Sequence, residues 1–426
     1  MIVSLPVKSV MVTSGVTPLK IMFIENGIGY GGAALSLFNH LKALDPNRFK
    51  CVVVTPRGGT GYDDYTKVAA LHVLPDQTVS RSALRRFFRR VLPLAPVADR
   101  CASAADYLVN LLPYVVRLVA LLRREHVRVV VLNNDPVCNM GGVIAARLMG
   151  LPVASFVRGT LWRSWLTSLL LGKVDRLIAI SGFVRGELAA LDVDPETVMI
   201  VRSIRDWSRF DTCLDAVQVR VEMGLSPGEV AIGITGLLIP WKGQSIFLQA
   251  AAKVLADYGN ARFIVIGGGV EEYPDYPEQL RELVKSLGIG GKVTFMGQRT
   301  DMPRLLAGLD IVVHASTDPE PLGLVIAEGM VMEKPVIATA LGGPLELIEE
   351  GRTGFLVPPG DPVALATRLT VLVADPELRC RVGKAARIWA LENFSRERET
   401  MKLVALYEEL SATRGAEEHP AGGTRA

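Results

Sequence analysis

The stretch "DIVVHASTDPEPLGLVIAEGMVMEKPVIATA", residues 310–340, holds a complete strand–turn–helix–strand unit. Its two ends, 310–316 and 335–340, are short apolar runs typical of buried parallel strands. Between them, Pro321 suits the first turn of a helix, which we expect over about 322–332. Such a unit is the building block of a doubly wound α/β domain.

The same rhythm of short apolar runs and longer helical segments continues on both sides of this unit. In the first half the runs are 20–25, 51–55, 127–133, 152–157, 176–181 and 197–201. In the second half they are 230–235, 262–267, 292–297, 310–316, 335–340 and 354–358. Because the series starts twice and 426 residues exceed one usual core, we predict an α/β chain with two doubly wound, Rossmann-like domains facing across a cleft.

The domain boundary falls where strand character is lost, in residues 206–227. The predicted organisation is an extension, a first domain, a second domain, a C-terminal helix packing back on the first domain, and a disordered tail, over 1–19, 20–205, 206–394, 395–410 and 411–426. Doubly wound domains bind ligands beyond the carboxyl ends of their strands, so we expect the site between the domains.

Composition narrows the function classes. The chain is 49% hydrophobic and 21% charged, which argues against disorder, and a net charge of +3 gives no reason to expect nucleic-acid binding. The five cysteines form no C-x-x-C pair, and the five scattered histidines form no metal-ligand pattern. Residues 1–20 do not resemble a signal peptide, and the apolar stretch 107–122 is too short to span a membrane. We therefore expect a cytoplasmic protein without a bound metal.

One segment is unusually basic. Residues 81–128 contain ten arginines, no lysine and three acids, and "RSALRRFFRRVLPL" (81–94) places Phe87, Phe88 and Val91 among five arginines. This pattern suits a helix that lies on an anionic membrane surface. An ordinary basic helix face fits it equally well.

Two acids stand out in the opening stretch. Glu320 and Glu328 are eight positions apart, roughly 12 Å in a helix, whereas a glycosidase pair needs about 5 to 9.5 Å. The spacing favours two carboxylates that hold separate hydroxyl-bearing parts of one long ligand. The backbone amides of Leu322, Gly323 and Leu324 would add partners for phosphate or sugar oxygens. The alternative is a helix-capping Glu320 and an incidental Glu328.

These residues resemble a known motif. E-P-L-G-L-V-I-A-E (320–328) is similar to the E-x7-E motif of retaining glycosyltransferases of the GT-B fold, in particular the large family-four group. The segments 24–44, 174–188, 236–254 and 292–361 also resemble that family, and the resemblance covers about residues 20–410. It implies a metal-independent transferase with no cofactor. Its donor would be a nucleotide-diphosphate sugar bound by the second domain, and its acceptor a glycan or lipid-linked hydroxyl on the side of the first.

The resemblance also implies roles for individual residues. Glu328 would bind the ribose, Glu320 the transferred sugar, and Lys242 the diphosphate leaving group, although Lys242 as a solvated surface lysine is the alternative. The remaining donor-binding positions would be Gly31, Gly32, Gly236, Gly297, Arg299, Leu322, Gly323 and Leu324. A hairpin or packing role is the alternative for Gly31 and Gly32.

Several positions depart from the family pattern. Leu237 stands where an arginine is usual, and Arg158 stands where a histidine is common. We hypothesise that Arg158 is a catalytic cation that partly replaces the missing charge; Arg202, Arg205 and Arg299 are competing candidates. The usual N-G-[IV]-D stretch reads Ser-Ile-Arg-Asp at 203–206. Trp162 and Trp165 could stack on an acceptor, or pack.

Three functions follow as hypotheses. The first is a retaining glycosyltransferase in cell-envelope polysaccharide synthesis, in the cytoplasm or at the inner face of the membrane. The second is a catalytically weakened GT-B module that binds nucleotide-sugar or supports a partner transferase, which Leu237 keeps open. The third, a nucleotide-sugar epimerase, has no distinctive motif here.

Overall fold

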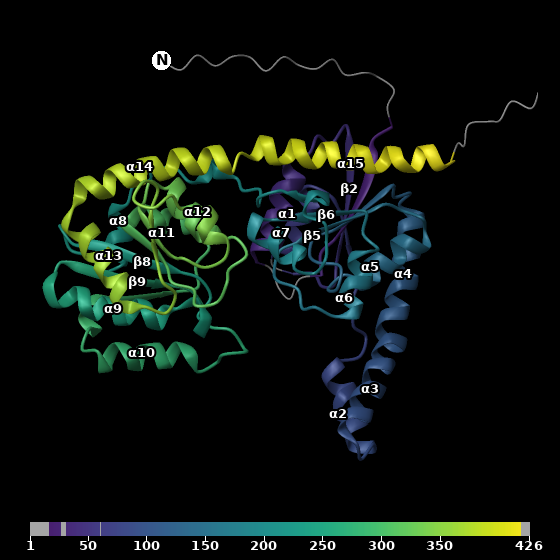
Figure 1. Cartoon of the computed structure of the whole chain (residues 1–426), viewed down its shortest axis with the longest axis horizontal. Coiled ribbons are helices and arrows are strands. Elements are labelled where there is room, and N and C mark those ends of the chain that lie inside the picture. The colour runs from purple at the N-terminus through teal and green to yellow at the C-terminus, as the bar shows by residue number, and fades with distance from the viewer. Residues whose placement is uncertain (1–16, 27–30, 60, 419–426) are drawn as a thin grey trace, which may run out of the picture.

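A computed structural model of the chain describes residues 17–26, 31–59 and 61–418 (Figure 1). Its first sheet has the order β3-β2-β1-β4-β5-β6-β7, with every neighbouring pair parallel. The strands are β1 Leu19–Ile24, β2 Phe49–Thr55, β3 Ala70–Val73, β4 Val129–Leu132, β5 Val153–Val157, β6 Arg176–Ala179 and β7 Val198–Ile200. The central strands β4 and β5 are buried at every position, as expected of strands covered by helices on both faces.

The second sheet is also parallel and has the order β10-β9-β8-β11-β12-β13. Its strands are β8 Val230–Thr235, β9 Ala261–Ile266, β10 Val293–Gly297, β11 Ile311–His314, β12 Val336–Thr339 and β13 Phe355–Val357. The predicted fold class is therefore confirmed. Each predicted strand is present; β3 was missed because its four residues form no continuous apolar run and lie at the sheet edge, where they are only half-buried.

Helices connect the strands on both faces of each sheet. In the first half they are α1 Gly32–Ala43, α2 Arg81–Val91, α3 Ala95–Asp106, α4 Leu112–Arg124, α5 Met140–Leu148, α6 Trp165–Leu171 and α7 Gly182–Ala189. In the second half they are α8 Val217–Glu222, α9 Gln244–Asp257, α10 Tyr276–Ser286, α11 Met302–Gly308, α12 Leu324–Val331, α13 Pro362–Ala374, α14 Pro376–Asn393 and α15 Arg396–Glu418.

The strand order reverses once in each sheet, between β1 and β4 and between β8 and β11. At such a switch point the loops that leave the two neighbouring strands run in opposite directions, which opens a crevice at their carboxyl ends. The loop after β8 carries Lys242 and the loop after β11 carries Glu320. The topology therefore brings these two residues to neighbouring strand ends, although 78 positions separate them.

The last two helices lie along one side of both halves of the molecule (Figure 1). Helix α14 packs on the second domain: Arg387 donates to the carbonyl of Val331 at the end of α12. Helix α15 packs on the first half: Tyr407 hydrogen-bonds buried His40 at 3.0 Å, and Lys402 donates to the carbonyl of Ile200 at 3.1 Å. Helix α15 continues to Glu418, eight residues past the end predicted at 410, because alanine, arginine and glutamate in 411–418 favour helix.

Helices α2 and α3 form a hairpin that extends away from the rest of the molecule, on the side opposite α15 (Figure 1). Helix α3 continues through a π-helical turn, Tyr107–Leu111, into α4 without a break. This run, Ala95–Arg124, is long and apolar enough to cross a membrane by length and composition alone, whereas we expected the shorter stretch 107–122 to fall short. Its second half packs on the sheet, however, through Tyr114, Leu118 and Leu122.

Parts of two predicted segments lie outside the described residues. These are residues 1–16 of the predicted N-terminal extension and residues 419–426 of the predicted tail.

Candidate functional site

The site is built around an ion pair between Lys242 and Glu320. Lys242 Nζ donates to Glu320 Oε1 at 2.7 Å, and both side chains are largely buried. The ammonium group also lies over the Trp241 ring, 4.3 Å from its centre. Gly243 makes this arrangement possible, because it has a φ of 72° and a Cβ there would meet the carbonyl oxygen of Ala315 at 1.9 Å. The structure thus brings two predicted site residues into contact.

Glu320 has further partners on its other oxygen. His314 Nε2 hydrogen-bonds Glu320 Oε2, and Ser316 Oγ donates to the same atom at 3.0 Å. Burial alone would raise the pKa of Glu320, but the hydrogen bond with His314 and the charge of Lys242 outweigh it and hold the pKa well below its usual range. Glu320 is therefore a carboxylate at neutral pH, suited to accepting hydrogen bonds and not to donating a proton.

Helix α12 presents unpaired amides beside this ion pair. It begins at Leu324 and not at 322 as predicted, because Gly323 precedes it in the left-handed region with a φ of 82°. Within the described part of the chain, the N–H groups of Leu322, Gly323 and Leu324 donate to no other backbone or side-chain group. The amide of Gly343 donates to Glu320 O at 2.7 Å and fixes the loop. Free amides at a helix start can bind an anionic or hydroxyl group.

The second predicted acid, Glu328, is held from the segment between the two sheets. Arg205 donates to Glu328 Oε1 at 2.7 Å, and both side chains are nearly buried. Burial raises the pKa of Glu328, and the charge of Arg205 opposes that rise. Glu328 is thus a buried, paired acid, and its Oε2 is free of any hydrogen bond or ion pair within the described chain.

The two halves of the molecule also meet through Glu346. Its carboxylate accepts hydrogen bonds from the amides of Gly182 (2.9 Å) and Phe183 at the start of α7, where the helix dipole favours a negative charge. Ser181 Oγ donates to the carbonyl of Pro321 in the loop that carries Glu320. Across the same contact, a Cβ on Gly32 would lie 3.7 Å from Leu324 Cδ1, so the start of α1 faces the start of α12.

The other predicted donor-binding residues lie at strand ends or loop starts. Gly31 precedes α1 and is exposed. Gly236 directly follows β8 and Gly297 is the last residue of β10, and these two strands lie on either side of β9. Arg299 donates to Asp301 at 2.7 Å and to Glu222 at 3.0 Å, so two carboxylates of the second half already share its charge. Arg299 is consequently a poor substitute for the arginine missing at Leu237.

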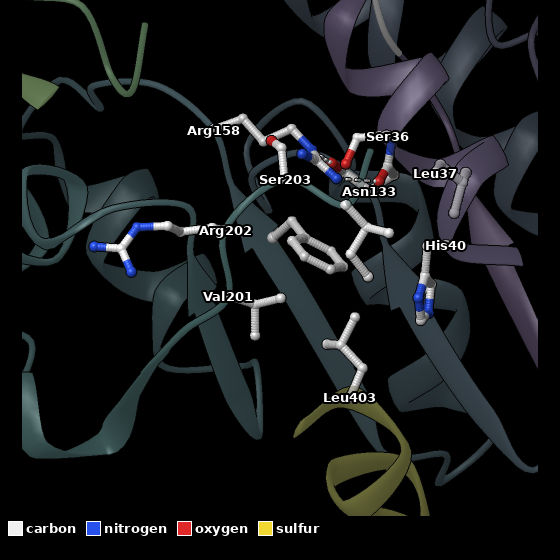
Figure 2. A pocket seen from close by; sticks show the side chains of 11 residues that line it. Ser36, Leu37, His40, Asn133, Arg158, Val201, Arg202, Ser203 and Leu403 are labelled. Carbon is white, nitrogen blue, oxygen red and sulfur yellow. Dashed lines mark hydrogen bonds between the residues drawn. The ribbon is translucent and has the colours of Figure 1, made fainter. Parts of the chain in front are cut away.

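Arg158 lies apart from the Lys242–Glu320 pair. Figure 2 shows its guanidinium directed toward Asn133, to whose carbonyl and side-chain oxygens it donates at 2.7 Å each. It lines a cavity of about 10 Å³, room for one water, together with Ser36, His40 and Asn133. Burial lowers the pKa of Arg158 to about 10, so it stays charged at neutral pH. Within the described residues no hydrogen bond or ion pair joins Arg158 to Lys242 or Glu320.

Sequence reasoning missed some residues of this site. His314 and Ser316 belong to the quoted strand, and their position at its carboxyl end beside the turn to Glu320 was an available signal. Glu346 offered none, because its partners on α7 are more than 160 positions away. Trp162 and Trp165 are 90% and 78% exposed, which excludes the packing role left open for them.

Comparison with known proteins agrees with the fold. The family model described as glycosyl transferases group 1 matches residues 219–389, and the model described as glycosyltransferase family 4 matches residues 30–204. Together they account for most of the chain. Among solved structures, Anabaena Alr3699/HepE, determined in complex with UDP and glucose, superposes with a TM-score of 0.77 at 23% identity, over 92% of this chain and 100% of that one.

Curated relatives match over shorter lengths. The D-inositol 3-phosphate glycosyltransferase of Salinispora arenicola is 31% identical over 260 residues, 58% of this chain and 57% of that protein. The lipopolysaccharide core biosynthesis mannosyltransferase LpsB of Rhizobium meliloti is 29% identical over 259 residues, 60% and 71% respectively. This chain spans about half the length of the first of these relatives and of several others.

Proposed function

The chain belongs to the group 1 glycosyltransferases of the GT-B fold, and on that premise we propose that it is a retaining, hexosyl-transferring enzyme. Its donor is a nucleotide-diphosphate sugar, and its acceptor is a hydroxyl of a glycan or lipid-linked molecule. The relative that acts in lipopolysaccharide core biosynthesis supports a role in cell-envelope polysaccharide synthesis.

The observation that carries the proposal is the Lys242–Glu320 pair beside the free amides of α12. Lys242 supplies a positive charge, and the amides of Leu322, Gly323 and Leu324 supply hydrogen-bond donors, at one topological switch point. Glu320 is an ionised acceptor for sugar hydroxyls. A diphosphate and a sugar need this combination of groups.

In the proposed reaction, the bond between the sugar's anomeric carbon and the β-phosphate oxygen breaks, and the acceptor oxygen bonds to that carbon on the same face. The departing phosphate oxygen takes the acceptor proton, so no protein nucleophile is required. Lys242 stabilises the negative charge that builds on the leaving group. Glu320 orients the sugar and remains ionised throughout.

The two halves take different roles in this proposal. Residues 206–394 bind the donor, with Glu328 on the ribose and with Gly236, Gly297 and Arg299 lining the part of the site around the phosphates and the base. Residues 20–205 carry the acceptor, and Gly31 and Gly32 approach the donor from that side. Arg158 is proposed as the catalytic cation of the first half, where two hydrogen bonds to Asn133 fix it.

A second function, a weakened module that binds nucleotide-sugar or supports a partner transferase, is favoured by Leu237. This residue is half-exposed at the end of β8, beside the Lys242 loop, and carries no charge. In the structure Lys242 is the cation paired with Glu320, whereas the charge of Arg299 is shared by Glu222 and Asp301.

Assaying release of nucleoside diphosphate tests the proposal. The protein is incubated with a panel of nucleotide-sugars, with and without oligosaccharide and lipid-linked acceptors. The transferase predicts acceptor-dependent release with one donor–acceptor pair. Donor binding, seen as raised thermal stability, without release across the panel would favour the binding module instead.

We also propose that the protein works in the cytoplasm at the inner face of the membrane, with peripheral contact through residues 81–128. Arginines and exposed apolar side chains in this segment support that contact.

A further inference from the structure

The tip of the α2–α3 hairpin exposes apolar side chains that a folded domain normally buries. Helix α2 buries none of its residues, and Phe87 and Val91 are each 60% exposed. Leu94 in the turn and Val97 on α3 are 63% and 43% exposed. Phe87, Val91, Leu94 and Val97 together form the apolar tip of the hairpin. Within eleven positions they form a cluster, unlike scattered surface apolar residues, which need no explanation.

Arginines are interspersed with the apolar tip along the sequence. Two of them connect the helices: Arg89 pairs with Asp99 through two hydrogen bonds, of 3.0 and 2.8 Å, and Arg81 pairs with Asp106 at 3.1 Å. These pairs use both acids of the hairpin. In the described chain Arg86, Arg90 and Arg100 form no ion pair. The hairpin therefore has surplus positive charge next to exposed apolar surface.

The two kinds of side chain are segregated on α2. At 100° per residue, Ala83, Leu84, Phe87, Phe88 and Val91 share one face, and all five arginines share the other. An apolar face flanked by arginines matches a bilayer interface, where apolar groups enter the acyl region and guanidinium groups meet phosphates. A helix that only faces solvent needs neither an apolar face separated from its charged face nor charges that are all positive.

We propose that the α2–α3 hairpin is a docking element for an anionic lipid bilayer, with the apolar tip inserted and Arg86, Arg90 and Arg100 on the headgroups. The charge surplus selects anionic over zwitterionic lipid, and the inserted apolar area and the electrostatic attraction add to the binding strength. The hairpin extends clear of both sheets, so it reaches a surface without disturbing the site (Figure 1). This inference deepens the membrane contact proposed above and rests on that part of the proposed function. It does not depend on the transfer reaction.

Vesicle sedimentation with the full chain tests it, using phosphatidylcholine vesicles with and without phosphatidylglycerol. The wild type should sediment with the anionic vesicles only, and less at high salt. Phe87→Ser/Val91→Ser should weaken binding with the net charge unchanged. Arg86→Gln/Arg90→Gln should weaken it roughly 30-fold, since each arginine near an anionic surface contributes about a fivefold gain.

The matched control is Val371→Ser/Ile388→Ser, which removes two exposed apolar side chains from α13 and α14. It should bind like the wild type. Unchanged circular dichroism and melting temperature show that each variant is folded. Equal wild-type binding to both vesicle types, or full binding by the tip variant, would overturn the proposal. So would a dimer that the tip variant abolishes without any vesicle binding, because the tip would then contact a second copy.

Vesicle binding needs neither donor nor acceptor. A negative result therefore leaves the transfer reaction untouched, and a negative transfer assay leaves the vesicle result untouched.

Discussion

Arg205 and Glu328 form a nearly buried ion pair at 2.7 Å that joins the segment between the two sheets to helix α12. Arg205 stands in the Ser-Ile-Arg-Asp stretch where the family resemblance led us to expect an apolar residue. Glu328 is the acid proposed to bind the donor ribose. The pair therefore links the proposed nucleotide site directly to the interdomain connection.

The first prediction concerns this pair. Arg205→Met should lower the free energy of unfolding by about 3–5 kcal/mol at pH 8, since it leaves a buried carboxylate unpaired. Burial already raises the pKa of Glu328, and the variant raises it further. A raised carboxyl pKa adds stability at low pH that is lost as pH rises, so the deficit should shrink at pH 5. Urea unfolding at both pH values measures it.

Arg205→Met/Glu328→Gln is the matched control, because it removes both charges. It should recover most of the stability lost at pH 8. A deficit of equal size at pH 5 and pH 8 would mean that the unpaired carboxylate is not its cause.

The second prediction concerns Lys242. Lys242→Met should lower turnover by roughly 10²–10³-fold, the usual effect of removing one group that stabilises developing charge. Donor affinity should fall less, because the amides of α12 remain. Steady-state release of nucleoside diphosphate and calorimetric donor binding separate the two effects. Partial rescue by Lys242→Arg is expected; an unchanged turnover in Lys242→Met would remove Lys242 from the mechanism.

The third prediction uses the depressed pKa of Glu320. In the wild type, Glu320 should contribute no acid limb to the pH–rate profile between pH 5 and 8, because it is already ionised there. His314→Phe removes one hydrogen-bonding partner and leaves burial, so the pKa of Glu320 should rise and turnover should fall at the acid end. Ser316→Ala should change the profile less. An identical profile in His314→Phe would contradict the assigned cause.

The fourth prediction concerns Arg158. If it is the cation of the first half, Arg158→Ala should lower turnover even though Arg158 does not contact Lys242. Asn133→Ala should reproduce part of that loss, because Asn133 fixes the guanidinium. Full donor affinity and full turnover in Arg158→Ala would exclude it.

Much of this fold follows from local pattern. Continuous apolar runs predict each strand except β3, whose short edge position gives it little need for apolar residues. Helix α12 begins two residues later than predicted, because Gly323 adopts a left-handed conformation that apolar periodicity does not reveal.

The site was predictable only within each half of the molecule. Lys242 and Glu320 meet because β8 and β11 are neighbours in a doubly wound sheet, which the sequence pattern indicates. The contacts of Arg205 with Glu328 and of Glu346 with α7 depend on how the two halves are placed. Neither residue type nor spacing encodes that placement.

The most direct test of the central claim, that Glu328 holds the ribose of a nucleotide donor, is calorimetric binding of nucleoside diphosphates. Uridine, guanosine and adenosine diphosphates are compared first, and the tightest is then compared with its 2′,3′-dideoxy counterpart. The wild type should bind the dideoxy compound roughly tenfold or more weakly, as expected for lost hydrogen bonds to a charged group. Glu328→Ala should bind both alike. A wild type that does not distinguish them, or a Glu328→Ala variant that still does, would contradict the account.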